Sequence, residues 1–298
     1  MSAIALERWI EQARYFEFNG QRIAYWTTGE GEPLLLIHGF PSASWDWHQQ
    51  WQALAERYQV IACDMLGFGL SAKPQNHRYC LLEQADLQQA LLKHLAIDQP
   101  LHVLAHDYGD SVAQELLARH QQAQIELASC VFLNGGLFPE THKPVLAQRL
   151  LLSRWGRLLV KGFSKRSLEK NLTKIFGANT APKAQELEAL WALLQHNNGV
   201  SVLPLLIQYM PQRRVLRERW LAAMQQCTVP LRVIDGAADP ISGVHMVQRY
   251  RELIESADTV LLEGIGHYPQ LEAPQAVLDH YLQFRQRLEA RRCNDVRC

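Results

Sequence analysis

The sequence has no net charge, because its 30 Lys and Arg residues cancel its 30 Asp and Glu residues. That balance removes the simplest electrostatic case for a protein that binds nucleic acid. The six cysteines form no C-x-x-C pattern and no Cys/His pattern with the spacing of zinc ligands, so we expect no metal site. No G-x-G-x-x-G stretch opens a helix, so we expect no nucleotide cofactor either.

Long apolar runs are also missing. Charged residues interrupt the first twenty positions, so this stretch resembles neither a signal peptide nor a membrane span, which needs about 20 apolar residues. We therefore expect a reduced, cytoplasmic setting. With 298 residues, 48% of them hydrophobic, the chain can bury a large core without disulfides, as an ordinary globular protein does.

Strand-like runs recur along the chain, and amphipathic helical patterns separate most of them. Two runs flank Asn19-Gly20 and predict an opening hairpin. Six short apolar runs follow, as expected for strands covered by helices on both faces. The eight runs are Tyr15–Asn19, Arg22–Thr27, Leu34–His38, Gln59–Cys63, Leu101–Ala105, Ser129–Leu133, Leu231–Asp235 and Thr259–Leu262. They predict an α/β fold with an eight-stranded, mostly parallel, twisted sheet.

This rhythm breaks between residues 137 and 219, which show helical patterns at Val145–Lys161 and Gln185–Gln195 but no convincing strand. We interpret 137–219 as a helical cap inserted into a core of residues 1–136 and 220–298, lying over the carboxyl edge of the sheet. The cap has fourteen Lys or Arg and five Asp or Glu residues, a net charge of +9. Its densest basic cluster is Arg213, Arg214, Arg217 and Arg219. These charges indicate either solvated helix faces on an acidic body or a surface for an anionic membrane or acyl substrate.

A possible nucleophile follows the strand that begins at Leu101. The stretch Ala105-His106-Asp107-Tyr108-Gly109 has small residues on both sides of a central residue, at a strand-to-helix turn. This spacing is typical of a nucleophile elbow, in which small residues permit a tight, strained turn. No G-x-S-x-G exists in the sequence, so Asp107 takes the place of a serine.

Three further motifs lie where other strands end. They are His38-Gly39-Phe40-Pro41, Gly236-Ala237-Ala238-Asp239-Pro240 and Gly266-His267-Tyr268-Pro269. With Asp107 they give the chain order nucleophile, acid, histidine. On these motifs the chain resembles, over about residues 15–288, the α/β-hydrolases with an Asp nucleophile, which include epoxide hydrolases and haloalkane dehalogenases. His106–Asp110, Asn134-Gly135-Gly136 and Gln208-Tyr209 further resemble the mesoderm-specific transcript protein group.

The resemblance implies a cofactor-free hydrolase with an Asp-His-Asp triad. Asp107 is expected to attack an electrophilic carbon and form an alkyl-aspartyl ester. His267 is expected to activate the water that hydrolyses this ester, with Asp239 orienting the imidazole. Asp235 is the alternative acid, but it lies inside the apolar strand. In some dehalogenases the acid follows the strand before the cap, where this chain has Asn134, which is not a carboxylate.

The backbone amides of Phe40 and Tyr108 are expected to form the oxyanion hole. The side chains at these two positions differ from the Trp and Asn that commonly bind halide in similar dehalogenases, which favours epoxides. Similar epoxide hydrolases use cap tyrosines as acids, and this cap has one, Tyr209, with His142 or His196 as possible substitutes. We therefore expect an epoxide hydrolase-like enzyme whose partners are a small apolar electrophile and water. The alternatives are a haloalkane dehalogenase-like hydrolase and a non-catalytic ligand-binding or interaction protein on the same fold.

Overall fold

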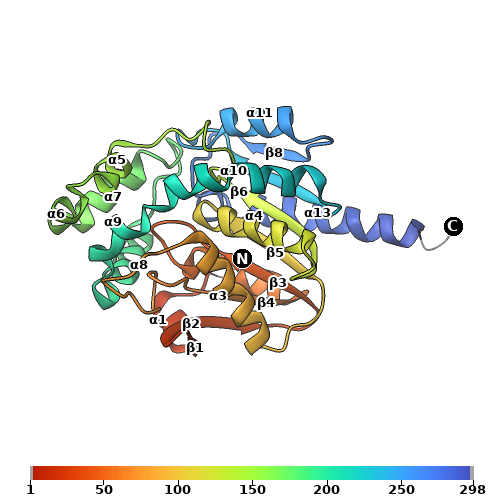
Figure 1. Cartoon of the computed structure of the whole chain (residues 1–298), viewed down its shortest axis with the longest axis horizontal. Coiled ribbons are helices and arrows are strands. Elements are labelled where there is room, and N and C mark those ends of the chain that lie inside the picture. Colours follow the sequence, from red (N-terminus) through yellow and green to blue (C-terminus); the bar gives the residue numbers. More distant parts are fainter. Residues whose placement is uncertain (1–2, 296–298) are drawn as a thin grey trace.

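The computed structural model describes residues 3–295 of the chain. Its centre is one eight-stranded sheet in the order β1-β2-β4-β3-β5-β6-β7-β8 (Figure 1). The pairs β1–β2 and β2–β4 are antiparallel and the other five are parallel, so the predicted fold class is confirmed. The strands are β1 (Arg14–Phe18), β2 (Gln21–Thr28), β3 (Glu32–Ile37), β4 (Tyr58–Cys63), β5 (Leu101–His106), β6 (Leu127–Leu133), β7 (Leu231–Gly236) and β8 (Thr259–Leu262).

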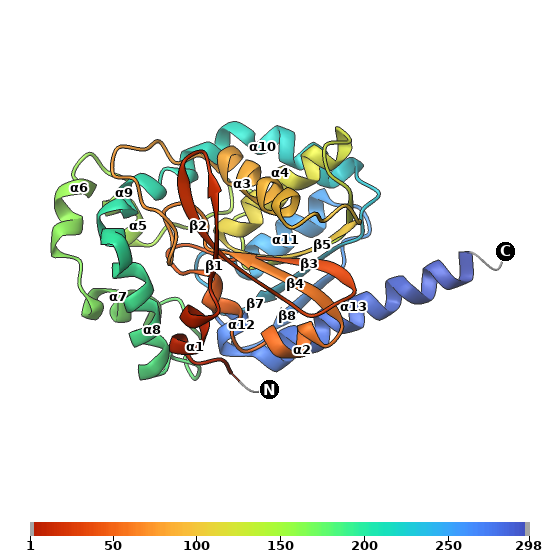
Figure 2. The same cartoon turned by 90° about the horizontal axis from the view of Figure 1, so that it is seen from below.

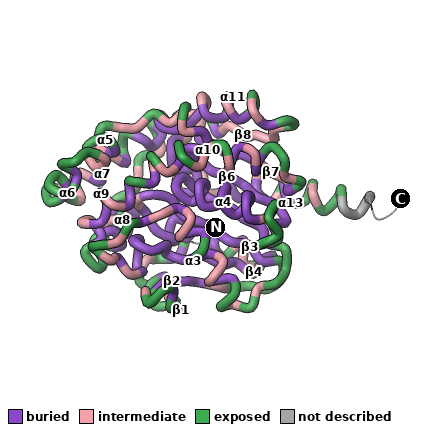
Figure 3. Tube along the Cα trace, in the orientation of Figure 1, coloured by how far each residue is buried: buried purple, intermediate pink, exposed green. Residues whose placement is uncertain are grey.

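Helices cover both faces of the sheet. The helices α3 (Leu81–His94) and α4 (Tyr108–Gln121) lie on one face, while α2 (Trp51–Ala55) and α13 (Pro274–Asp295) lie on the other (Figure 2). Every residue of β5 and of β6 is buried, which explains why the inner strands are continuous apolar runs (Figure 3). The remaining core helices are α1 (Leu6–Glu11), η1 (Ser44–Trp47), α11 (Val244–Leu253) and α12 (Pro269–Glu272).

Between β6 and β7 the chain is helical, as predicted for the cap. The elements are α5 (Leu146–Leu152), α6 (Gly156–Leu159), η2 (Val160–Gly162), α7 (Lys165–Thr173), α8 (Ala184–Gln195), η3 (His196–Val202), α9 (Leu203–Leu206) and α10 (Tyr209–Gln226). The prediction of one continuous helix over 145–161 is wrong, because the backbone of Ser153 is extended and its hydroxyl donates to the Leu150 carbonyl. The predicted boundary at 219/220 falls inside α10, whose Arg219 and Trp220 both donate to Glu115 of α4.

One carboxylate ties the cap to the loop that follows β8. Glu272 Oε2 accepts hydrogen bonds from the amides of Gly177 and Gly266, at 2.7 and 2.8 Å. The amide of His267 in turn donates to the carbonyl of Ile175 at 2.7 Å. The cap therefore fixes the backbone beside the predicted catalytic histidine. No helix in residues 3–295 combines the length and the apolar character that crossing a membrane requires.

Candidate active site

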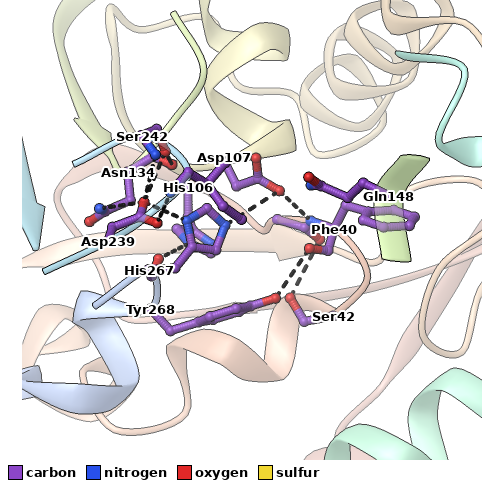
Figure 4. Close-up of polar contacts among 12 residues, drawn as sticks. Phe40, Ser42, His106, Asp107, Asn134, Gln148, Asp239, Ser242, His267 and Tyr268 are labelled. Carbon is purple, nitrogen blue, oxygen red and sulfur yellow. Dashed lines mark hydrogen bonds and ion pairs between the residues drawn. The ribbon is translucent and has the colours of Figure 1, made fainter. Parts of the chain in front are cut away.

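Asp107 lies at the sharp turn between β5 and α4. Its backbone has φ 46° and ψ −102°, a strained conformation for a residue with a side chain. A Cβ on Gly109 would lie 2.5 Å from the carbonyl oxygen of Ile37, so the small residue after the turn is required by the close approach of β3. Asp107 is 3% exposed, and Figure 4 shows it beside His267, Phe40 and Gln148, which come from separate parts of the chain. The structure therefore has the elbow geometry that the sequence predicts.

The predicted oxyanion hole is only half formed. The amide of Phe40 donates to Oδ2 of Asp107 at 3.2 Å. Among the described residues no such bond joins the amide of Tyr108 to the Asp107 carboxylate. Phe40 thus holds Oδ2, which leaves Oδ1 outside the predicted oxyanion hole.

His267 lies between the carboxylates of Asp107 and Asp239, the residues predicted to form a triad with it. Nδ1 of His267 is 2.8 Å from Oδ2 of Asp239, and Nε2 is 4.0 Å from Oδ2 of Asp107. The backbone amides of Ile241 and Ser242 donate to the Asp239 carboxylate at 2.8 and 3.1 Å. Asp239 is thus held in place, and His267 directs its other nitrogen towards the elbow (Figure 4).

Asn134 contacts both candidate acids, Asp239 and Asp235. Its side-chain amide donates to Oδ2 of Asp239 at 3.0 Å and accepts from the amide of Gly236 at 2.7 Å. Asp235 instead accepts from the backbone amide of Asn134 at 2.6 Å. Asn134, which lies where some dehalogenases have their acid, therefore contacts Asp239, the predicted acid. The motif Asn134-Gly135-Gly136 was visible in the sequence, but its contact with Asp239 was not.

The charges of the three groups depend on one another. Burial raises the pKa of Asp107, but the His267 and Arg213 cations outweigh this and hold it below its usual value. Burial likewise raises the pKa of Asp239, and the charge and hydrogen bond of His267 reverse that shift. Burial lowers the pKa of His267, whereas Asp239 and then Asp107 raise it, to about 9 in total. At neutral pH the site holds two carboxylates and an imidazolium.

Arg213 is a site residue that the sequence did not identify. The Arg213 side chain comes from α10, is 2% exposed, and has Nη2 at 2.8 Å from the carbonyl oxygen of Asp107 and 3.4 Å from its Oδ1. Its Nε donates to the hydroxyl of Ser111 at 2.6 Å. Arg213 belongs to a basic cluster, and nothing in the local sequence distinguishes it from its exposed neighbour Arg214.

Tyr209, the predicted cap acid, packs against two residues next to the elbow and the predicted oxyanion hole. It is 1% exposed, and its ring centroid is 5.0 Å from that of Tyr108 and 5.8 Å from that of Phe40. Its hydroxyl is buried and has no partner among the described residues. Of the two possible substitutes, His142 lies near Arg213, whereas His196 is exposed and has no recorded contact with the triad.

The cap contributes one more polar group. Gln148 from α5 is 9% exposed, and its Oε1 accepts from the amide of Val145 at 3.1 Å. Figure 4 shows that the amide end of Gln148 points towards Asp107, so its nitrogen is available to a substrate there. A single glutamine on an amphipathic cap helix gives no sequence signal for this role.

The space around the elbow is narrow. Two small cavities involve its neighbours: one of about 10 Å³ is lined by Pro41 and Tyr268, and one of about 30 Å³ by His142 and Arg213. The larger hollows, of about 780 and 590 Å³, are lined by other parts of the chain. No cluster of three or more His, Cys, Asp or Glu in the described part of the chain could hold a metal ion. The residues present can supply a nucleophile, a base and hydrogen-bond donors.

Comparisons with known proteins agree with this fold. Residues 32–274 match the family described as alpha/beta hydrolase fold. The chain is 39% identical to the human mesoderm-specific transcript homolog protein over 293 residues, covering 94% of this chain and 88% of that one. It is 27% identical to a soluble epoxide hydrolase of Corynebacterium sp., covering 89% and 94%. A haloalkane dehalogenase structure from Bradyrhizobium elkani superposes with a TM-score of 0.78 at 21% identity, covering 93% and 98%.

Proposed function

The chain belongs to the alpha/beta hydrolase fold family, and from this premise we propose that it is a hydrolase with Asp107 as nucleophile. The observation that carries the proposal is the carboxylate at the elbow, with His267 4.0 Å away and Asp239 bonded behind the imidazole. A serine hydrolase would have a hydroxyl at this turn, which an imidazole must deprotonate. Asp107 is already ionised, so it can attack without a base.

With an epoxide as substrate, the first step opens the ring. Oδ1 of Asp107 attacks an epoxide carbon, which forms an ester C–O bond and breaks the C–O bond of the ring. The electron pair of the broken bond stays on the departing oxygen, which takes the proton of the Tyr209 hydroxyl. Burial strongly raises the pKa of Tyr209, so this proton leaves only as the more basic alkoxide develops. The amide of Phe40 holds Oδ2 throughout.

The second step depends on the charge that the first step removes. Esterified Asp107 no longer raises the pKa of His267, so the imidazole becomes neutral more readily. His267 then accepts a proton from water, the hydroxide adds to the carboxyl carbon of Asp107, and the bond from that carbon to the alkyl oxygen breaks. The expelled alkoxide takes the proton of the hydroxyl that was added to the carboxyl carbon, so the diol leaves and the carboxylate is restored. The proton that the imidazolium gave up on becoming neutral returns to the Tyr209 phenolate. Asp239 stabilises the imidazolium formed on the way.

The epoxide subtype is supported by the buried Tyr209 hydroxyl, which has no partner among the described residues and whose ring packs against Tyr108 and Phe40, and by the similarity to a soluble epoxide hydrolase. Phe40 and Tyr108 offer halide no side-chain N–H, in contrast to a Trp or Asn. A haloalkane dehalogenase activity would need the same triad but no proton donor for the leaving group. Only the choice of substrate in an assay therefore distinguishes it from epoxide hydrolysis.

One turnover in heavy-oxygen water tests the nucleophile. The first product should carry only unlabelled oxygen, and peptide mass analysis should find the label in the carboxylate of Asp107. In His267→Gln, intact-mass spectra should show a trapped adduct with an epoxide, and the matched Asp107→Ala variant should show none. Label in the first product, or no adduct from any epoxide or haloalkane, contradicts the mechanism. Ligand-dependent thermal stabilisation without turnover would instead support the binding-protein alternative.

A further inference from the structure

One nitrogen of the Arg213 guanidinium, Nη1, has no hydrogen-bond partner among the described residues. Nε and Nη2 are used by Ser111 and Asp107, whereas Nη1 is buried and has no partner among the described residues. A Cβ on Gly136 would lie 2.5 Å from Nη1 and 3.1 Å from Nδ1 of His142. Both ring nitrogens of His142 are also buried without partners. Two nitrogens thus face the same small region, and both side chains line the cavity of about 30 Å³.

The reaction leaves this arginine without its counter-ion. Among the described residues Asp107 is the carboxylate that pairs with Arg213, and esterification makes Asp107 neutral. A buried cation without a partner is costly. Asp110 and Asp235 cannot replace it, because burial raises the pKa of both well above the usual value, with further repulsion from Asp235 on Asp110 and from Asp239 on Asp235. A negative charge that the substrate brings would fill this role.

We propose that Nη1 of Arg213, with His142 beside it, binds a carboxylate of the substrate, so that the preferred substrate is a carboxylate-bearing electrophile. This inference rests on the proposed function of the same site. As the attack removes the negative charge from Asp107, the attraction between Arg213 and the substrate carboxylate becomes stronger. The interaction is therefore stronger after attack than before it, which is the condition for accelerating the step.

Calorimetric titration with butyrate and its neutral isostere butyramide tests the subsite without turnover. In Asp107→Asn, which imitates the neutral ester, butyrate should bind about tenfold or more tighter than in the wild type and tighter than butyramide. Intact mass must confirm that the new amide has not hydrolysed. Arg213→Gln in that background should abolish the preference for butyrate, and Arg213→Lys should keep part of it.

Equal binding of butyrate and butyramide, or a preference that survives Arg213→Gln, would overturn the subsite. Tighter binding of inorganic phosphate than of butyrate would overturn the carboxylate class. Each of these outcomes is independent of the heavy-oxygen experiment, so the subsite can fail while the nucleophile stands.

A second, independent feature is the tip of the cap, defined here as residues Leu146–Lys161. Five of the eight exposed large hydrophobic side chains of the described chain lie on this tip: Leu146, Leu150, Trp155, Leu158 and Leu159. Figure 1 shows α5 and α6 at the end of the molecule opposite α13, and Figure 3 shows the same end largely exposed. Exposed apolar clusters of this kind mark interaction surfaces.

The charges around the tip have one sign. From residue 141 to 168 the sequence has seven Lys or Arg residues and no Asp or Glu. Arg149, Arg154, Arg157 and Lys161 are exposed, and no ion pair involves them among the described residues. In the cluster that the sequence singled out as most basic, by contrast, Arg213, Arg217 and Arg219 pair with Asp107, Glu140 and Glu115. The tip therefore carries four exposed cations without a carboxylate partner among the described residues.

We also propose that the tip docks on an anionic bilayer surface. Leucine and tryptophan side chains would enter the headgroup boundary while the basic side chains pair with anionic lipid, as in interfacial helices. Because α5 also carries Gln148, the docked face lies on a helix that reaches the site.

Vesicle flotation tests the docking. Full-length protein should float with vesicles of phosphatidylcholine plus phosphatidylglycerol and not with phosphatidylcholine alone, and added salt should release it. The double variant Trp155→Ser/Leu158→Ser should lose about tenfold or more in vesicle affinity, whereas Ile10→Ser, exposed elsewhere, should not. No dependence on anionic lipid, or a concentration-dependent dimer that the double variant abolishes, would overturn the proposal.

Discussion

Nη2 of Arg213 lies 2.8 Å from the main-chain carbonyl oxygen of Asp107 and 3.4 Å from its carboxylate oxygen Oδ1. A cap helix thus holds both the strained backbone and the side chain of the candidate nucleophile. Together with His267, this contact holds the pKa of the carboxyl below its usual value, so Asp107 stays ionised. This one contact therefore connects the cap, the elbow and the chemistry.

Replacing Arg213 by methionine should raise the pKa of Asp107, because a cation that favours its ionised form is lost. The acid limb of the rate of ester formation, measured in single turnovers, should move to higher pH. Unfolding by urea should also show a loss of about 3–5 kcal/mol, since the buried carboxylate loses its partner.

Arg214→Met is the matched control for Arg213→Met, because Arg214 is the exposed neighbour on the same helix. It should change stability by no more than about 0.5 kcal/mol and leave the pH profile unchanged. Equal effects of the two variants would mean that the contact with Asp107 is unimportant.

Tyr209→Phe removes the hydroxyl proposed as the acid and keeps the ring that packs against Tyr108 and Phe40. Ester formation with an epoxide should slow by about 10²–10⁴-fold, the usual contribution of a positioned acid. Hydrolysis of the ester already formed should be unaffected. Stopped-flow or quenched single turnovers separate these steps, and slowing of the second step alone would remove Tyr209 from the proposed role.

Asp239→Asn should slow ester hydrolysis by about 10³–10⁴-fold, because the imidazole loses the carboxylate that sets its tautomer. The double variant Asp239→Asn/Asn134→Asp returns a carboxylate to the same cluster, since the two side chains are 3.0 Å apart. Part of the lost rate should return. A double variant slower than Asp239→Asn alone would show that position 134 cannot supply the acid.

The pKa of His267 predicts how stability changes with pH. It is about 9 in the folded chain and 6.5 in the reference state, so the folded form binds the proton more tightly. The resulting stabilisation is fully present below about pH 6.5 and is lost as the pH rises through about 9. Thermal unfolding across this interval should show a steeper decline for the wild type than for His267→Gln, and parallel curves would contradict the assignment.

The core of the fold follows from local patterns. Short apolar runs predicted the six strands β3 to β8, because a strand buried on both faces needs apolar residues at nearly every position. The two runs that flank Asn19-Gly20 predicted β1 and β2 as a hairpin. The run Thr259–Leu262 matches β8 residue for residue. The apolar spacing over Trp45–Glu56 is typical of one helix, but the Trp45 carbonyl accepts from the amide of His48 and closes a 3₁₀ turn that ends at Trp47. Local hydrogen bonds of this kind are not visible in hydrophobic spacing.

The sequence by itself determined the elbow, because small residues around a polar centre at a strand-to-helix turn are a local requirement of the backbone. It also placed Asp107, Asp239 and His267 at strand ends, where a parallel sheet brings them to one edge. Only the tertiary structure decided that Arg213, and not Arg214, reaches the nucleophile, and that Asn134 bonds to Asp239. These contacts join residues about a hundred positions apart. The first depends on how α10 packs on the core, and the second on the pairing of β6 with β7, neither of which a local pattern encodes.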